Sequence, residues 1–371
     1  MKKYLFFAAA LLCATAANAK LWRINYEDNA KADFKTITAA CSATKVADTD
    51  TLYCEAGYHA GSASDNVISR KGMTVMGPGW GFEANYGNTT TICEARFSNN
   101  LTIAADNVKL SGAVCDNSIT LGSNVSRSGI LIERCKADEI YWSFLTSNKL
   151  LTDITILNCN ISSKLQLGGS TAYASSIRNI YIVGNIIRND NDAISCVSIT
   201  GVADQIRNVN IINNTIIGRF TSTGTSIIKT INSLIQDNII INTANETFVM
   251  SFAQTGNIIR KNVFSLSQDN VTAYISENYP DNYYNGATLA NTFTCQSNSK
   301  YRTEEYYLLK DDSPAKNAAY DGGDCGAFGG TTPYIICGRP QGVPYIYDVE
   351  VPAQPTDNKL HVTFKVKGQN E

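Results

Sequence analysis

The amino-acid sequence predicts an all-β protein, a right-handed parallel β-helix with a helical cap at its N-terminal end and a short antiparallel β appendage at its C-terminus. Three observations predict this fold: a motif that recurs through the centre of the chain, alternation of apolar and polar residues within each copy, and no helical pattern between copies. Alternation with a period of two indicates a half-buried strand, and a repeat of about 20 to 30 residues made of such strands indicates a solenoid.

The motif is an alternating segment that ends in Cys or Asn. Its copies end at Cys135, Cys159, Asn185, Asn214, Asn238 and Asn262, so that the spacings are 24, 26, 29, 24 and 24 residues. A leucine-rich repeat has a similar period but would carry leucines at fixed offsets, whereas these copies are rich in Ile, Val and Asn. Parallel strands joined by a crossover are right-handed in nearly all cases, and this preference predicts the hand of the coils.

The recurring Asn has a structural interpretation. Asn tolerates unusual backbone angles at a bend, and its amide satisfies free backbone groups. In coils about 4.8 Å apart, such side chains can hydrogen-bond along the stack. Cys135 and Cys159 fall in the same column, where they form either a disulfide or a stack of free thiols.

The two ends of the solenoid have their own patterns. A short helix is expected at about residues 36–44 and a strand at 51–54, and the helix would cover the apolar side chains of the first coil. Residues 68–79 and the segment ending at Cys115 are interpreted as early coils. The predicted organisation is a β-helix with its cap at 20–310, a closing cap segment at 311–340 and a β-hairpin appendage at 341–371.

Residues 1–19 predict an exported protein. Two lysines precede an apolar run of about nine residues from Leu5 to Cys13, and Ala17-Asn18-Ala19 predicts cleavage after Ala19. The run is too short to span a membrane, for which about 20 apolar residues are needed. We therefore expect a secreted, periplasmic or cell-surface monomer without a membrane span.

Cysteine content and charge restrict the partners further. Ten cysteines follow the predicted cut, so disulfides are expected, with Cys41–Cys54 and Cys325–Cys337 closing the shortest loops. The sequence contains no cluster of Cys and His residues, so no metal site is predicted. The net charge of −2, from 31 basic and 33 acidic residues without a basic run, argues against nucleic acid as a partner.

Several segments resemble a known group of proteins. The strand-and-turn segments DTDTLYCEAGYH and TVMGPGWGF, the Asn-rich coils and the closing segment DDSPAKNAAYDGGDCGAFGG resemble secreted right-handed β-helix proteins of Bacteroidota and, more widely, the pectate-lyase-like superfamily. The resemblance covers about residues 34–371. It implies an extracytoplasmic protein linked to carbohydrate, and many members of the group have no known activity.

Two functional hypotheses follow. The first is a non-catalytic protein that binds or displays toward a polysaccharide or surface glycan. Its candidate ligand-binding residues are Arg178, which with Arg207 would form a basic ladder for an anionic sugar, and Trp142, Tyr283 and Tyr284, because aromatic faces stack on sugars. Exposed loop charges and a coil-end cap are the alternative explanations for these residues.

The second hypothesis is a polysaccharide lyase or glycoside hydrolase that acts on uronate-containing glycans. Asp190, Asp192 and Arg207 are its candidate catalytic residues, since two carboxylates two positions apart in an extended segment face the same way. A lyase would also use Ca²⁺; no other cofactor is expected. A solvated loop is the competing interpretation, and the Gly-His-Gly and Arg-Ile-Lys motifs of polygalacturonase-like proteins are absent.

Overall fold

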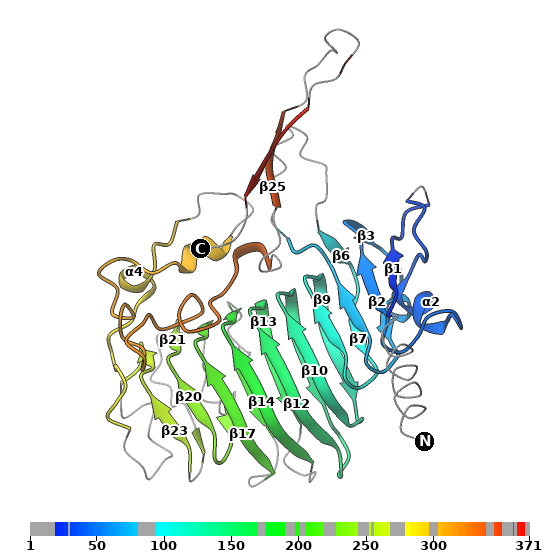
Figure 1. Ribbon diagram of the computed structural model, residues 1–371. Coiled ribbons are helices and arrows are strands. Elements are labelled where there is room, and N and C mark those ends of the chain that lie inside the picture. Colours follow the sequence, from blue (N-terminus) through cyan, green and yellow to red (C-terminus); the bar gives the residue numbers. More distant parts are fainter. Residues whose placement is uncertain are drawn as a thin grey trace, which may run out of the picture.

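The computed structural model describes most of the chain after the predicted signal peptide. The described residues are 19–28, 30–80, 94–169, 175–189, 197–200, 205–218, 228–243, 252–253, 256–267, 279–296, 303–338, 345–350, 359 and 362–367. Over this part of the chain the fold is a parallel β-helix, as predicted (Figure 1).

The first sheet receives one strand from each coil. It joins, in spatial order, ten of the described strands: β1 (Leu21–Ile24), β2 (Thr51–Cys54), β5 (Thr74–Met76), β8 (Lys109–Ser111), β10 (Arg127–Glu133), β12 (Leu150–Leu157), β14 (Ser176–Val183), β17 (Ile206–Ile212), β20 (Leu234–Gln236) and β23 (Ile258–Arg260). Each strand pairs in parallel with the strand of the next coil.

The second sheet supplies the other two sides of each coil. Its main path contains β3 (Gly57–His59), β6 (Ala95–Phe97), β9 (Val114–Ser123), β11 (Lys136–Ser143), β13 (Asn160–Gly168), β15 (Ile186–Asn189), β18 (Thr215–Gly218), β21 (Ile239–Asn242) and β24 (Val263–Phe264). Two side branches leave this path: β7 (Leu101–Ile103) and β4 (Val67–Ile68) join it at β9, and β16 (Val197–Thr200), β19 (Ile228–Lys229) and β22 (Phe252–Ala253) join it at β13. Strand β13 pairs with β15 at its start and with β16 at its end, so the long strands turn a corner between the two sides.

Aliphatic side chains from all sides fill the interior of the coils. In β14, Ile177, Ile180 and Ile182 point inward and are fully buried. Neighbouring coils place like residues in register, for example Ile154 against Ile180. Because burial of each such side chain stabilises the fold by about 1.5–3 kcal/mol, the alternation in the sequence fixes which side of each strand faces the core.

An asparagine ladder runs through the turn between the first and second sheets. We give this name to Asn185, Asn214, Asn238, Asn262 and Asn282. The backbone N–H of each of the first four donates to the side-chain Oδ1 of the next, at 2.9, 2.9, 3.0 and 2.9 Å. The ladder therefore satisfies buried amides that the strands leave free.

The turn residue before Cys159 and before each of the first four ladder positions has a left-handed backbone. The φ angles of Asn158, Gly184, Asn213, Asp237 and Lys261 lie between 52° and 63°. Asn, Asp and Gly adopt this region more readily than other residues. The same turn geometry in successive coils keeps the ladder amides aligned.

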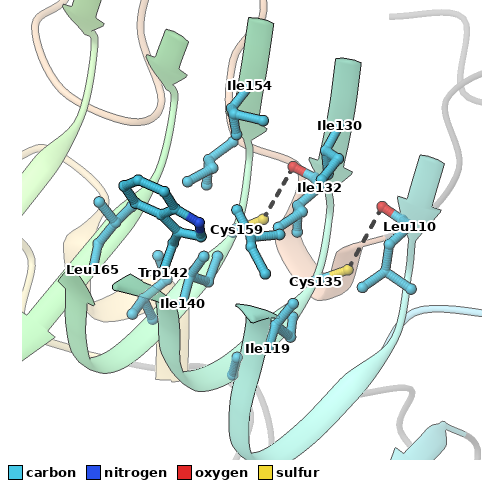
Figure 2. Packing of buried hydrophobic residues seen from close by; sticks show 14 of the residues in the cluster. Leu110, Ile119, Ile130, Ile132, Cys135, Ile140, Trp142, Ile154, Cys159 and Leu165 are labelled. Carbon is cyan, nitrogen blue, oxygen red and sulfur yellow. Dashed lines mark hydrogen bonds between the residues drawn. The ribbon is translucent and has the colours of Figure 1, made fainter. Parts of the chain in front are cut away.

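The cysteines that precede the ladder are free thiols, not a disulfide. Cys135 Sγ lies 3.9 Å from the carbonyl oxygen of Leu110, and Cys159 Sγ lies 3.6 Å from that of Ile132 (Figure 2). The ladder amides make the corresponding contact to the preceding coil, so each thiol stands in the place of an amide.

The expected disulfides do not form elsewhere in the described chain. Eight cysteines there are free: Cys41, Cys54, Cys115, Cys135, Cys159, Cys295, Cys325 and Cys337. All except Cys295 are buried. The cysteines are free thiols and not the expected disulfides because most of them serve as small apolar side chains of the core.

A short helix lies beside the first coils, as the sequence predicts. Helix α2 (Ile37–Ser42) begins after Thr36, whose side chain accepts a hydrogen bond from the backbone N–H of Ala39 at 3.1 Å. The helix buries Ile37, Ala40 and Cys41. This packing covers apolar residues near the N-terminal end of the solenoid.

Two tyrosines cover the last coil at the other end. The ring of Tyr284 stacks on Phe264 with centroids 5.5 Å apart, and its hydroxyl donates to the carbonyl of Tyr279 at 2.8 Å. The short helix α4 (Leu289–Thr292) follows.

The C-terminal segment, residues 303–338, runs back along the outside of the coils. It contains the 3-10 turns η2 (Thr303–Tyr307) and η3 (Ile336–Gly338). Three hydrogen bonds attach its backbone to the coils. Gly326 N donates to the carbonyl of Asp237 at 2.8 Å, the side-chain amide of Asn158 donates to the carbonyl of Pro333 at 3.2 Å, and Trp80 N donates to the carbonyl of Cys337 at 2.8 Å. The region expected as a closing cap thus lies along the side of the solenoid, where it covers outward-facing aliphatic residues of the second sheet.

The last described strands form an antiparallel pair. Strands β25 (Tyr345–Glu350) and β26 (Thr363–Lys367) pair with a register shift after Ile346. In the part of the chain that the structure covers, we find no helix with the length and apolar character needed to cross a membrane.

Candidate functional site

Two arginines lie side by side on the outer face of the first sheet. Arg178 in β14 and Arg207 in β17 are direct partners in the parallel register. The preceding residues, Ile177 and Ile206, are fully buried, so both arginines belong to the outward set of positions. Adjacent strands lie about 4.8 Å apart, which brings the two positive charges into one small area.

The charges at this position repel each other. At the spacing of neighbouring strands, about 5 Å, two unit charges would repel by about 1 kcal/mol in water and by about 3 kcal/mol at the effective dielectric of a protein surface. Among the described residues, the hydrogen-bond partner of the exposed Arg178 is the hydroxyl of Ser176, at 3.5 Å. Arg207 is half-buried and is held by interactions within the chain. An anion placed between the two guanidinium groups would relieve the repulsion.

An exposed aromatic ring lies on the same face. Tyr181 in β14 is 45% exposed, and its register partners are Thr155 and Asn210 in the flanking strands. Tyr181 follows Arg178 by three residues, which in a regular strand would put the two side chains on opposite faces. The left-handed backbone of the intervening Asn179, with φ 53°, resets the alternation and turns both side chains outward.

A row of polar side chains accompanies the arginines. Asn208 donates to the side-chain oxygen of Asn179 at 3.2 Å, and Asn179 donates to that of Asp153 at 3.0 Å. All three residues have φ between 53° and 56°. We call the arginine pair, Tyr181 and this row the arginine-tyrosine face.

The structure separates the candidate catalytic residues into those it describes and those it does not. Asp190 and Asp192 lie outside the described residues. Arg207 lies beside Arg178, as above. Arg188, at the end of β15, donates from Nη1 to the hydroxyl of Tyr307 in the C-terminal segment, at 2.9 Å.

Trp142 is not available to a sugar. Its ring is fully buried, packs against Phe144 at 5.4 Å and donates from Nε1 to the carbonyl of Val125 at 3.0 Å. Figure 2 shows Trp142 among the interior side chains with Ile140. The prediction that Trp142 stacks on a sugar ring is therefore wrong, because Trp142 shares the inward face of β11 with Ile140, two residues earlier.

The two candidate tyrosines near the C-terminal end differ. Tyr284 is half-buried against Phe264 as part of the cap over the last coil. Tyr283 is 46% exposed, and its backbone pairs with Val263. Both lie at the end of the solenoid, beyond the last coil of the first sheet.

The described residues contain no group of three His, Cys, Asp or Glu side chains that could hold a metal ion. The residues expected to accompany Ca²⁺ in a lyase, Asp190 and Asp192, are outside that part of the chain, so the calcium expectation stays a prediction.

No protein-family model matches the chain, and no curated protein matches it.

Proposed function

We propose that this chain is an exported β-helix protein that binds an acidic polysaccharide, such as a uronate-containing glycan, on the arginine-tyrosine face. The observation that carries the proposal is the in-register pair Arg178 and Arg207 with the exposed ring of Tyr181 on the same face. Guanidinium groups bind carboxylates in a bidentate way, and an aromatic face packs against a sugar ring.

The rigidity of the surface supports binding. The strands that carry the arginines belong to the continuous parallel sheet, and their neighbours Ile177, Ile180 and Val209 are locked in the core. A ligand that meets such a surface orders few protein side chains, so less of the contact energy is lost.

Export is part of the proposal and rests on the leader. Residues 1–19 have the charged start, short apolar run and small-residue motif that a signal peptidase recognises. An exported protein would meet polysaccharides outside the cytoplasm.

A glycan-array screen of the purified protein, followed by calorimetry with the best acidic oligosaccharide, tests the function. We expect Arg178→Ala to weaken binding about 10-fold to 100-fold, the loss expected for a charge-assisted hydrogen bond of about 1.5–3 kcal/mol. Arg178→Lys should recover only part of the loss, because lysine keeps the charge but not the fork of donors. Lys71→Ala, which removes an exposed charge elsewhere, is the matched control.

The aromatic contact has its own control. Tyr181→Ala should weaken binding, whereas Tyr58→Ala, which removes a ring of equal exposure on β3 in the second sheet, should not. Equal binding by all variants would contradict the proposal. An ultraviolet assay for unsaturated uronate products in the same samples tests the alternative, a polysaccharide lyase that uses Asp190, Asp192 and Arg207.

A further inference from the structure

A buried carboxylate near the N-terminal end of the solenoid has no part in the arginine-tyrosine face. Asp50 is only 1% exposed. Its Oδ1 accepts a hydrogen bond from the backbone N–H of Lys20 at 2.8 Å, and its Oδ2 accepts from Trp22 Nε1 at 2.7 Å and from the backbone N–H of Ala47 at 2.8 Å. A carboxylate in such a position needs compensation for its lost hydration.

The compensation in the uncleaved chain comes mainly from neutral donors, with a smaller contribution from the positive charge of Lys20. Burial alone would raise the pKa of Asp50, but the hydrogen bonds from Trp22, Ala47 and Lys20 hold it below its ordinary value. The ammonium groups of Lys20 and Lys45 lie over the Trp22 ring, 5.5 and 4.9 Å from its centre. Asp50 therefore carries a negative charge that no described side-chain ammonium pairs with directly.

One of these donors is the first residue after the predicted cut. Lys20 is held on both sides, because its N–H donates to Asp50 and its carbonyl accepts from Thr51 N at 2.8 Å. Hydrolysis by a signal peptidase adds water across the Ala19–Lys20 peptide bond: the C–N bond breaks, Ala19 keeps the new carboxylate and the Lys20 nitrogen takes up protons. The atom that donates to Asp50 then becomes an ammonium.

We propose that the Asp50 carboxylate, held in place by hydrogen bonds from Trp22 and Ala47, forms a binding site for the α-ammonium group that export creates at Lys20. The inference rests on the proposed export of the chain. The inference also predicts the position of the cut. Cleavage one residue earlier would place the ammonium group on Ala19 instead of on the nitrogen that donates to Asp50, and cleavage one residue later would remove Lys20 and its nitrogen.

The ion pair changes the titration of the new N-terminus. An α-amino group ordinarily titrates at about 7.7–8.0, and a rise of one pKa unit corresponds to a 10-fold change in the folding equilibrium. Because the ion pair raises the pKa of this α-amino group in the folded state, the stabilisation it provides is present below about pH 8. The stabilisation is lost as the pH rises through the folded-state pKa. The charged groups around it are Asp50 and the side chains of Lys20 and Lys45.

The test uses the full mature chain, released from a fusion partner so that it starts at Lys20. Matched chains either retain Ala19 or carry an acetyl group on Lys20, and each is made with Asp50 and with Asp50→Asn. We expect Ala19 and the acetyl group each to lower the folding constant at pH 7 at least 10-fold with Asp50 but less than 3-fold with Asp50→Asn. Equal losses in both backgrounds would overturn the inference.

A second measurement does not depend on the folding of Asp50→Asn. The α-amino pKa of the unaltered mature chain, measured from the pH dependence of amine labelling, should lie at least one unit above its ordinary value; an ordinary value overturns the inference whatever the glycan affinity. A raised pKa in a chain that binds no glycan overturns only the binding function. The mass of the protein exported by cells should show Lys20 as its first residue, and another start would count against the site.

Discussion

Removal of one ladder side chain is the sharpest perturbation of the fold. Asn214→Ala removes the side-chain amide nitrogen that donates to the carbonyls of Ile182 and Ile212, at 2.8 and 3.0 Å, and to Asn238 Oδ1 at 3.0 Å. The substitution also removes the side-chain oxygen that accepts hydrogen bonds from the backbone and side-chain nitrogens of Asn185, both at 2.9 Å.

The magnitude follows from what remains unpaired. The side-chain amide of Asn185 keeps its contacts with the carbonyls of Ile156 and Val183, but its buried backbone N–H loses the partner that the ladder supplies. An orphaned buried group costs about 1–3 kcal/mol, and each hydrogen bond lost to a carbonyl costs about 1 kcal/mol more. We therefore expect Asn214→Ala to lower the free energy of unfolding by about 3–5 kcal/mol.

The assay is urea unfolding followed by tryptophan fluorescence and circular dichroism, with coincident transitions required before a free energy is assigned. Asn210→Ala is the matched control, since Asn210 lies in the same coil, on strand β17 four residues before Asn214, half-exposed on the outside, and should change stability by less than about 0.5 kcal/mol. Asn214→Cys should cost less than Asn214→Ala, because the thiol of Cys159 occupies the equivalent place one coil before Asn185. Equal effects of Asn214→Ala and Asn210→Ala would refute the role of the ladder.

Three further predictions concern other parts of the molecule. Trp80→Phe removes the 2.6 Å hydrogen bond to the buried carboxylate of Glu304 and should weaken attachment of the C-terminal segment by about 2–3 kcal/mol, seen as faster hydrogen exchange there; unchanged exchange would argue against this anchor. Cys295, which is exposed, should be alkylated in the native protein well before Cys159, whose pKa burial raises; equal rates would contradict the buried thiol stack. Burial lowers the pKa of His59, so the unfolded state takes up the proton first and stability should fall as the pH drops below about 6.5; His59→Phe should show a smaller fall between pH 7.5 and 5.5, and an equal fall would contradict the assignment.

The repeat was readable from the sequence because each coil repeats the same local rule. Inward aliphatic residues and a turn Asn recur together, and the register of neighbouring strands then places Asn185, Asn214, Asn238 and Asn262 in one column. Asn282 extends the ladder but was not predicted, because it follows Asn262 by 20 residues and is not preceded by an alternating strand.

Two aromatic residues show what strict use of alternation adds. Ile140 and Trp142 share one face of their strand, which identifies Trp142 as a core residue. Tyr181 lies between the buried Ile180 and Ile182, which identifies it as an outward residue. Alternation in the sequence alone thus indicates that Trp142 is buried and that Tyr181 is exposed to a ligand.

Other features depend on contacts that no local pattern carries. The path of the C-terminal segment is set by contacts between residues far apart in the chain, such as Asn158 with Pro333 and Trp80 with Glu304. The state of the cysteines depends likewise on burial, since an even number of cysteines is compatible with a thiol-containing core as well as with disulfides.

The most direct test of the proposed function is a crystal structure of the mature protein with an acidic oligosaccharide selected by the array. The arginine-tyrosine face predicts sugar carboxylates within hydrogen-bond distance of the guanidinium groups of Arg178 and Arg207, with a sugar ring against Tyr181. An oligosaccharide bound to the second sheet or the C-terminal segment, with the first sheet bare, would contradict it.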